Sequence, residues 1–152
     1  MSSVIVLLIV LIGGVATAFQ AGVNGLLGKK IGIIEGSFVS FLTGTIVLLI
    51  LLLITSRGHL GPLVQALHVP KWQLTGGILG VIYVLIMIFA VPKIGTATTF
   101  VAIIAAQMLM STVIDHYGLF GKTVPINSYK VIGLMLLASA LFFIYKSSQV
   151  QG

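Results

Sequence analysis

Five long apolar runs divide the chain, and short segments rich in glycine, proline or basic residues separate them. A helix needs about 20 apolar residues to cross a hydrocarbon core of about 30 Å. The runs are continuously apolar, whereas the strands of a membrane barrel are shorter and alternate in polarity. We therefore predict an all-α membrane protein whose five transmembrane helices cover residues 4–27, 36–55, 72–91, 96–114 and 128–145.

Small and polar residues interrupt the first run. Spacings of four, three and four place one set on a single helix face: Gly13, Thr17, Gln20 and Asn24. The adjacent face carries a second set, in which every side chain is small: Gly14, Ala18, Ala21, Gly25 and Gly28. Small residues let membrane helices approach closely, so we expect the second face to pack against another helix.

The composition agrees with a membrane domain. Of 152 residues, 59% are hydrophobic and 7% are charged, whereas about a quarter of the residues in a soluble domain are charged. We expect one transmembrane domain over residues 1–152, surrounded by the lipid bilayer, with no soluble enzyme domain and no cofactor. The chain has no cysteine, and His59 and His68 match no common metal pattern, so we expect no metal site.

The eight Lys and Arg residues are scattered singly or in one pair near the ends of the runs, and they form no patch for nucleic acid. One side of the membrane would carry four of them: Arg57, Lys71, Lys122 and Lys130. The other side would carry the remaining four: Lys29, Lys30, Lys93 and Lys146. Because a Lys and Arg bias orients membrane proteins, this balance predicts insertion in both orientations. Two such copies would form an antiparallel homodimer of ten helices, unless other factors impose a single orientation.

Uncharged polar side chains inside the runs are the candidates for a substrate cavity: Gln20, Asn24, Tyr83 and Gln107. Polar groups within a membrane are costly and usually face a bundle interior or a watery cavity. Gln107 lies near the middle of the fourth run, and Gln20 lies about five residues, roughly 7 Å, past the middle of the first. These amides either line a cavity or form hydrogen bonds between helices, and the sequence leaves both readings open.

Two acids, Glu35 and Asp115, are the only carboxylates in the chain. Glu35 opens the second run, where a carboxylate suits the positive end of the helix dipole, and it follows Lys29 and Lys30. Capping or ion pairing is therefore the favoured role for Glu35. Asp115 is followed by His116, which makes a titrating pair at the membrane edge conceivable. Both acids are candidates for coupling transport to an ion.

Three stretches carry a family resemblance: residues 20–25 (QAGVNG), residues 72–84 with Trp72 and Tyr83, and residues 106–121 ending in DHYGLFG. The chain resembles the YdcZ-like family of bacterial inner-membrane proteins, within the drug/metabolite transporter superfamily. The resemblance implies a multi-pass, five-helix unit that works as a dual-topology homodimer. The more distant small multidrug resistance transporters have a central glutamate in their first helix. This chain has no acid there, so their proton-coupled mechanism is not carried over.

These observations favour a small-solute transporter of the bacterial inner membrane, an exporter that works by alternating access. A dual-topology ion channel and a non-transporting partner subunit are the alternatives. The sequence contains no Ser-His-Asp set, no phosphate-binding loop and no paired acids within a run, so we expect no enzyme.

Overall fold

The structure is a computed structural model that describes residues 3–56 and 61–150, so Arg57 and His59 lie outside the described residues. Its elements are α1 (Ser3–Ile31), α2 (Ile33–Ser56), α3 (Gly61–Gln65), the 3-10 helix η1 (Lys71–Thr75), α4 (Gly76–Ile94), α5 (Thr96–Tyr117) and α6 (Ser128–Val150). With η1 and α4 counted as one span, five segments of the described chain are long and apolar enough to cross a membrane. The predicted all-α fold with five membrane helices is confirmed, and each expected run lies inside an observed span.

Hydroxyl groups within the spans bond back onto their own helices. Ser37 and Thr45 each donate to the carbonyl four residues earlier at 2.8 Å, and Thr112 does so at 2.7 Å. In hydrocarbon a polar side-chain group without a hydrogen-bond partner costs several kcal/mol, as an unsatisfied backbone group does. Because each hydroxyl is bonded to a carbonyl of its own helix, these residues need no partner from another helix, whether they face lipid or a packed neighbour.

A single residue, Gly32, joins α1 to α2. Its φ of +105° suits glycine, and a Cβ placed there would collide with the carboxylate of Glu35. The Gly32 N–H donates to the Gly28 carbonyl at 3.0 Å, and the Gly36 N–H donates to the Gly32 carbonyl at 2.9 Å. The segment between the first two runs is thus helical on both sides of Gly32, because the N–H groups of Gly32 and Gly36 keep their helical partners.

The connection between α4 and α5 is shorter than expected. Pro92 lies inside the last turn of α4, which ends at Ile94, and only Gly95 separates it from α5. Pro92 has no N–H to donate to the Ile88 carbonyl, so the last turn of α4 lacks one helical hydrogen bond. Gly95 has a φ of +80° and lets the chain reverse within one residue.

The chain divides into two compact units, residues 1–92 and 93–152. In the first unit, α1, α2 and α4 meet around Gly28. A Cβ on Gly28 would collide with the Ile88 side chain of α4, and a Cβ on Gly36 of α2 would lie 3.2 Å from the Gly28 Cα. Gly25 packs in the same way, because a Cβ there would lie 3.4 Å from Val91. The predicted packing role of the small face of α1 is confirmed at Ala21, Gly25 and Gly28, which are buried.

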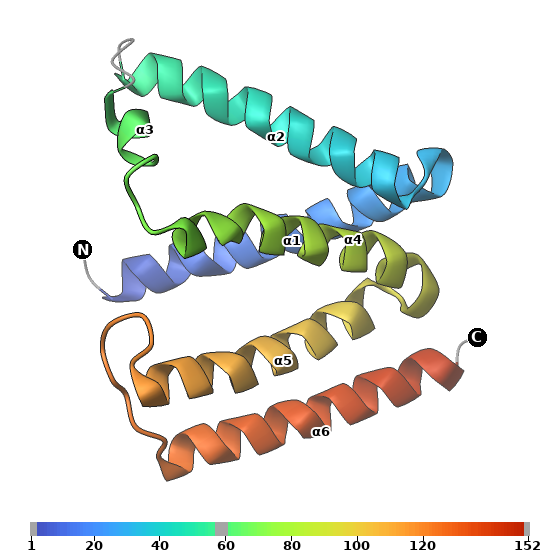
Figure 1. Cartoon of the computed structure of the whole chain (residues 1–152). Helices are drawn as coiled ribbons and strands as arrows, with labels where there is room; N and C mark the ends of the chain where they lie inside the picture. The colour runs from blue at the N-terminus through green and yellow to red at the C-terminus, as the bar shows by residue number, and fades with distance from the viewer. Residues whose placement is uncertain (1–2, 57–60, 151–152) are drawn as a thin grey trace. The chain divides into compact units, whose positions relative to one another are not determined.

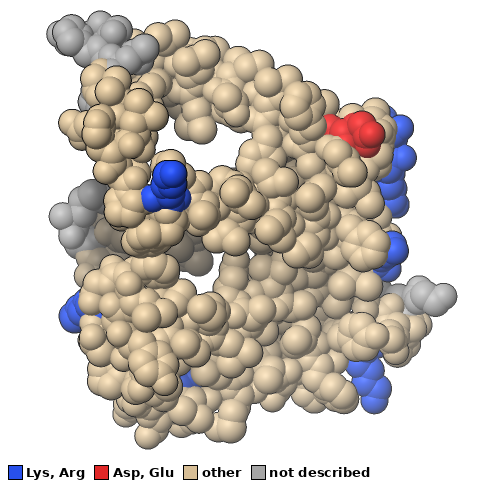
Figure 2. All heavy atoms as spheres, viewed as in Figure 1, with Lys and Arg blue, Asp and Glu red and all other residues tan. Residues whose placement is uncertain are grey.

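From that junction α2 diverges from α1 and α4 (Figure 1). Phe41 bridges the widening space, since its ring lies 3.6 Å from the position that a Cβ on Gly80 of α4 would occupy. Farther along, α2 has no buried residue beyond Ser37 among those described. The unit is therefore closed at the end that contains Gly28 and open between α2 and α4, where the space-filling view is hollowed (Figure 2).

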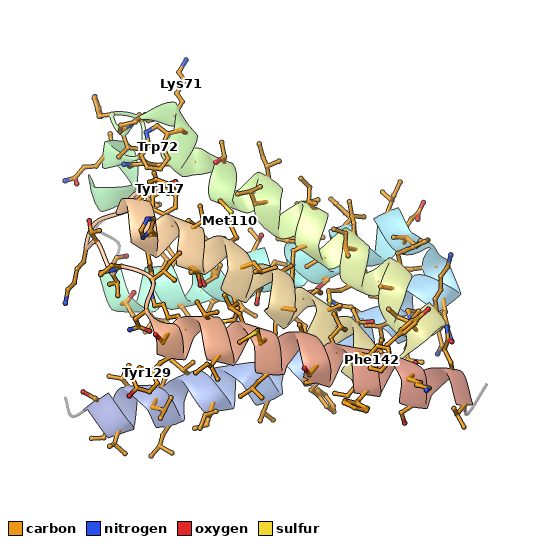
Figure 3. The ribbon with its side chains drawn as sticks, turned by 90° about the horizontal axis from the view of Figure 1, so that it is seen from below. Lys71, Trp72, Met110, Tyr117, Tyr129 and Phe142 are labelled. Carbon is orange, nitrogen blue, oxygen red and sulfur yellow. The ribbon has the colours of Figure 1, made fainter. Side chains whose placement is uncertain are left out.

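The second unit is the hairpin of α5 and α6, which pack side by side (Figure 1). Tyr129 extends from the start of α6, and Phe142 lies near its end (Figure 3). Both side chains are mostly exposed. Over the face shown in Figure 2 the surface is overwhelmingly uncharged, as a chain surrounded by lipid requires.

Candidate functional site

A small pit lies between the middle of α4 and α1, and we call it the amide pit. Its walls are Thr17, Gln20, Ala21, Asn24, Tyr83, Val84 and Met87. Spacings of three and four place the α1 members on one helix face, and the same rule aligns the α4 members. The Gly25 and Gly28 contacts hold the two faces together. Three of the four predicted cavity residues, Gln20, Asn24 and Tyr83, therefore line one pit.

Asn24 is the most deeply placed polar group of the amide pit, with 6% of its surface exposed. Its side-chain amide forms no hydrogen bond with any residue in the described ranges 3–56 and 61–150. The Thr17 hydroxyl, by contrast, is bonded to the Gly14 carbonyl at 2.9 Å. Among the described residues the only fully buried side-chain polar atom without a partner is Ser56 Oγ, so the Asn24 amide is not sealed off and keeps access to the pit. Asn24 is therefore the group of the pit with most to gain from a bound polar ligand.

A wider groove adjoins the pit, and we call it the apolar groove. It has a volume of about 220 Å³ and is lined by Gln20, Ser40, Phe41, Gly44, Thr45, Leu48 and Val84. Gln20 and Val84 line both spaces, so the groove and the pit adjoin at these two side chains. The Thr45 hydroxyl is bonded to the Phe41 carbonyl at 2.8 Å, which leaves most of the groove wall apolar.

No side chain in either lining is charged at neutral pH. The charges nearest to them along α1 and α2 are Lys29, Lys30 and Glu35, at the Gly32 turn. Ions bound within a membrane need paired charge or extensive hydrogen bonding. The pit and groove can offer amide, hydroxyl and apolar contacts, but no counter-ion from their own walls.

The fourth cavity candidate, Gln107, belongs to the second unit. It lies at the middle of α5, as predicted, and its side chain is exposed. Ser111, one turn later, donates its hydroxyl to the Met108 carbonyl at 3.2 Å. The structure therefore joins Gln20, Asn24 and Tyr83 to one another within the first unit, whereas Gln107 lies in the second.

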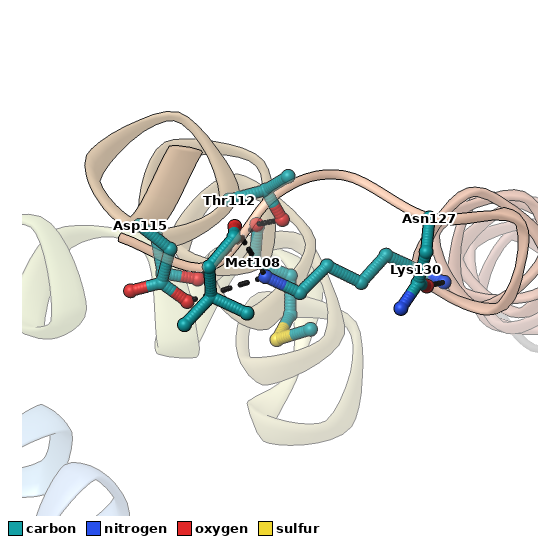
Figure 4. A network of polar contacts seen from close by, with 7 residues as sticks. Met108, Thr112, Asp115, Asn127 and Lys130 are labelled. Carbon is teal, nitrogen blue, oxygen red and sulfur yellow. Dashed lines mark hydrogen bonds and ion pairs between the residues drawn. The ribbon is translucent and has the colours of Figure 1, made fainter. Parts of the chain in front are cut away.

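The two coupling candidates stand in different settings. Glu35 is exposed in the first turn of α2, with its carboxylate beside Gly32, and it forms no ion pair among the described residues. Asp115 lies in the last turn of α5 and pairs with Lys130 of α6, with Lys130 Nζ 3.4 Å from Asp115 Oδ2 (Figure 4). The favoured ion pair of Glu35 with Lys29 or Lys30 is therefore not formed.

Asp115 also organises the loop that joins α5 to α6. Its carbonyl accepts the N–H of Gly118 at 3.3 Å and the N–H of Val124 at 2.9 Å. Gly118 ends α5 in the left-handed conformation, with a φ of +63°, and the Leu119 N–H donates to the Ile114 carbonyl. The bond from Gly118 to Asp115 and the bond from Leu119 to Ile114 together form a Schellman cap. The main chain and side chain of Asp115 together fasten the loop to both helices.

A family model described as "Putative inner membrane exporter, YdcZ" matches residues 5–143. The chain belongs to this YdcZ family. Neither the curated proteins nor the solved structures gave a match to this chain. The chain is therefore a multi-pass inner-membrane protein of a family named for export, which implies a transporter instead of an enzyme.

The three stretches that carried the family resemblance now have places in the fold. Residues 20–25 supply Gln20 and Asn24 of the amide pit and the Gly25 packing contact, and residues 72–84 supply Tyr83. The last stretch, DHYGLFG, is the end of α5 with its Schellman cap. Among the described residues no group of three His, Cys, Asp or Glu side chains could hold a metal ion.

Sequence reasoning missed the apolar groove. Gly36, Ser40 and Gly44 recur every fourth residue, a small-residue stripe that is typical of a packing face. Gly36 does pack against Gly28, but a Cβ on Gly44 would meet no atom within 4 Å. Ser40 and Gly44 line the groove instead. The sequence carried no clear signal of the groove, because the apolar residues beside this stripe, such as Phe41, are also typical of a lipid-facing surface.

A double-mutant cycle on Asp115→Asn and Lys130→Met should give a coupling free energy below about 1 kcal/mol, since exposed pairs contribute little. The side chains are 48% and 26% exposed, respectively. The coupling should fall as salt is raised. Thermal unfolding in detergent measures it, with Lys122→Met as the control, because Lys122 lies on the same loop and forms no ion pair with a described residue. A coupling of several kcal/mol would contradict the description of this pair as a modest fastener.

Proposed function

We propose that this YdcZ-family protein exports a small solute across the inner membrane, with the amide pit as its substrate site. The observation that carries this proposal is the unpaired amide of Asn24, a residue with 6% of its surface exposed, set beside Gln20 and Tyr83. An amide that served only to hydrogen-bond α1 to a neighbouring helix of this unit would have a partner there. Family membership supports export as the direction of transport.

The functional unit we propose is an antiparallel homodimer, in which each chain is a single transmembrane domain. Four Lys and Arg residues fall on each side of the membrane, so the chain carries no charge signal for one orientation. Five spans cannot form two equal inverted halves within one chain. A second copy in the opposite orientation supplies the inverted symmetry on which alternating access is built.

The proposed roles follow from where each residue lies. Gln20, Asn24 and Tyr83 bind the solute. Gln107 is assigned to the cavity of the dimer because it lies at the middle of its helix, where a substrate crossing the membrane must pass. Asp115 and Glu35 are the proposed coupling groups, since they are the only acids in the chain.

Alternating access would use the asymmetry of the first unit. The small-residue contacts around Gly28 close α1, α2 and α4 at one end, whereas α2 stands away from α4 at the groove. Movement of α2 about the one-residue turn at Gly32 would open or close the groove without unfolding a helix. The substrate site would then face one side of the membrane at a time.

Purified protein in liposomes loaded with a mixture of small neutral solutes should show saturable efflux of at least one of them, followed by mass spectrometry. Gln20→Leu and Gln107→Ala should each lower that efflux about three- to tenfold, the effect of losing one or two hydrogen bonds. Gln73→Leu is the matched control, because Gln73 lies in η1 and lines neither the pit nor the groove.

The same preparation distinguishes a carrier from a channel. A carrier gives slow turnover and counterflow against an external gradient of the same solute. Fast ion currents that do not saturate would contradict the proposal and support the channel. If Gln107→Ala leaves efflux unchanged, Gln107 is not in the site.

A further inference from the structure

We propose that the pit and groove form a two-part site for a small neutral amphiphile, with an apolar body in the groove and one polar atom of a hydroxyl or carboxamide group in the pit. This inference rests on the proposed export function and names the substrate class of the same site. It is carried by the sizes, polarities and shared wall of the two spaces.

The polar part has room for one small group. The amide pit has a volume of about 10 Å³, close to the minimum of about 10–15 Å³ that a single water needs. Asn24 offers both an N–H donor and a carbonyl acceptor there, and it is not paired with any described residue. A hydroxyl oxygen can donate and accept at once, and a primary amide can present either its N–H or its carbonyl oxygen to Asn24.

The apolar part has room for a ring-sized body. An apolar cavity of about 150 Å³ binds benzene, and the groove has about 220 Å³. Phe41, Leu48 and Val84 supply apolar wall, and Gly44 leaves the floor open because it has no side chain. A benzene ring with a short substituent fits this volume, and the apolar wall disfavours a polar sugar.

Gln20 connects the two parts. It lines both spaces, as Val84 does, so a ligand that occupies both spaces would lie against these two side chains. This arrangement sets a short separation between the apolar body and the polar group.

The absence of charge from both linings decides the class. A carboxylate or ammonium group in the pit would find amide and hydroxyl dipoles but no charged partner. Removing such a group from water without a counter-ion is far more costly than removing an amide. The site therefore selects the neutral member of a set of isosteric ligands.

Four probes of similar shape test this selection: 2-phenylacetamide, phenylacetate, 2-phenylethylammonium and ethylbenzene. Binding is measured by titration calorimetry on the full-length protein in lipid nanodiscs, with empty nanodiscs subtracted to remove partition into lipid. We expect saturable binding of 2-phenylacetamide that is at least about tenfold tighter than that of any of the other three probes. Equal or tighter binding of either ion, or no saturable binding of 2-phenylacetamide, would overturn the proposal.

Two variants locate the binding. Asn24→Leu removes the amide while keeping a similar volume, and it should weaken 2-phenylacetamide binding at least about tenfold. Gly44→Leu fills the groove without striking any atom within 4 Å of its Cβ, and it should weaken binding to the same extent. Gly133→Leu on α6 is the matched control, since Gly133 is equally unhindered and lines neither space, and it should bind normally. Unchanged binding in Gly44→Leu would exclude the groove even if Asn24→Leu failed to fold.

The outcome separates this inference from the export function. Neutral-selective binding that is lost in Gly44→Leu, without any flux in liposomes, would support the site and contradict export. Saturable flux of a charged solute by protein that does not prefer the neutral probe would support export and overturn the site described here.

Discussion

Replacing Gly28 by leucine should prevent α1, α2 and α4 from assembling, and replacing it by alanine should destabilise the first unit by about 1–3 kcal/mol. Gly28 is the point where the three helices meet. A Cβ there would collide with the branched side chain of Ile88, while Gly36 of α2 approaches the Gly28 backbone from another direction. With close neighbours on both α2 and α4, the new side chain has no free direction in which to move.

The destabilisation can be measured as the loss of helical circular dichroism with increasing mole fraction of dodecyl sulfate. The single tryptophan, Trp72 in η1, gives a second signal from the same unit. Gly22→Ala is the matched control on the same helix, because a Cβ on Gly22 meets nothing within 4 Å. It should be neutral or slightly stabilising, since alanine favours helix by up to about 1 kcal/mol over glycine.

A rescue identifies the cause of the effect. Ile88→Ala removes the side chain that an added Cβ at Gly28 would strike. The double variant Gly28→Ala with Ile88→Ala should therefore lose less stability than the sum of the single changes, by about 0.5–3 kcal/mol for residues in contact. Strict additivity would mean that the two residues do not meet.

The second large effect concerns orientation in the membrane. Lys29→Gln with Lys30→Gln leaves two Lys and Arg residues on the side that holds the C-terminus and four on the other. The more basic side stays in the cytoplasm. We therefore expect the C-terminus of this variant to lie predominantly outside, with a shift of about tenfold or more in the ratio of outward to inward copies.

The mirror variant is Lys71→Gln with Lys122→Gln, which removes two charges from the opposite side and should move the C-terminus inward by a similar factor. All four lysines are exposed, so neither variant should disturb packing. Lys130 is left unchanged because it pairs with Asp115. A shift of both variants in the same direction would contradict the charge argument.

The helices were predictable because the physics of hydrocarbon leaves little choice. A run of about 20 apolar residues without water must satisfy its backbone internally, and only a helix does so within one segment. The ends were less predictable. The turn between Lys29 and Glu35 is helical on both sides of Gly32, because the donors of Gly32 and Gly36 find carbonyls four residues earlier.

The site was predictable only as far as one helix allows. The spacing of Gln20 and Asn24 placed them on one face of α1, but nothing in the periodicity of α4 showed that Tyr83 would join them. Tyr83 lies beside them because Gly25 and Gly28 let α4 pack closely against α1. Small residues in a sequence indicate a close helix contact, but they do not show which helix makes it. The groove was missed because Phe41 and Leu48 are of the same apolar types as residues that face lipid.

The orientation of the unmodified chain is the most direct test of an antiparallel exporter. Two fusions at the C-terminus suffice: green fluorescent protein, which reports an inside location, and alkaline phosphatase, which reports an outside location. With four Lys and Arg residues on each side, we predict substantial activity of both reporters, each normalised to a fusion of fixed orientation. Activity confined to one reporter would contradict the antiparallel homodimer.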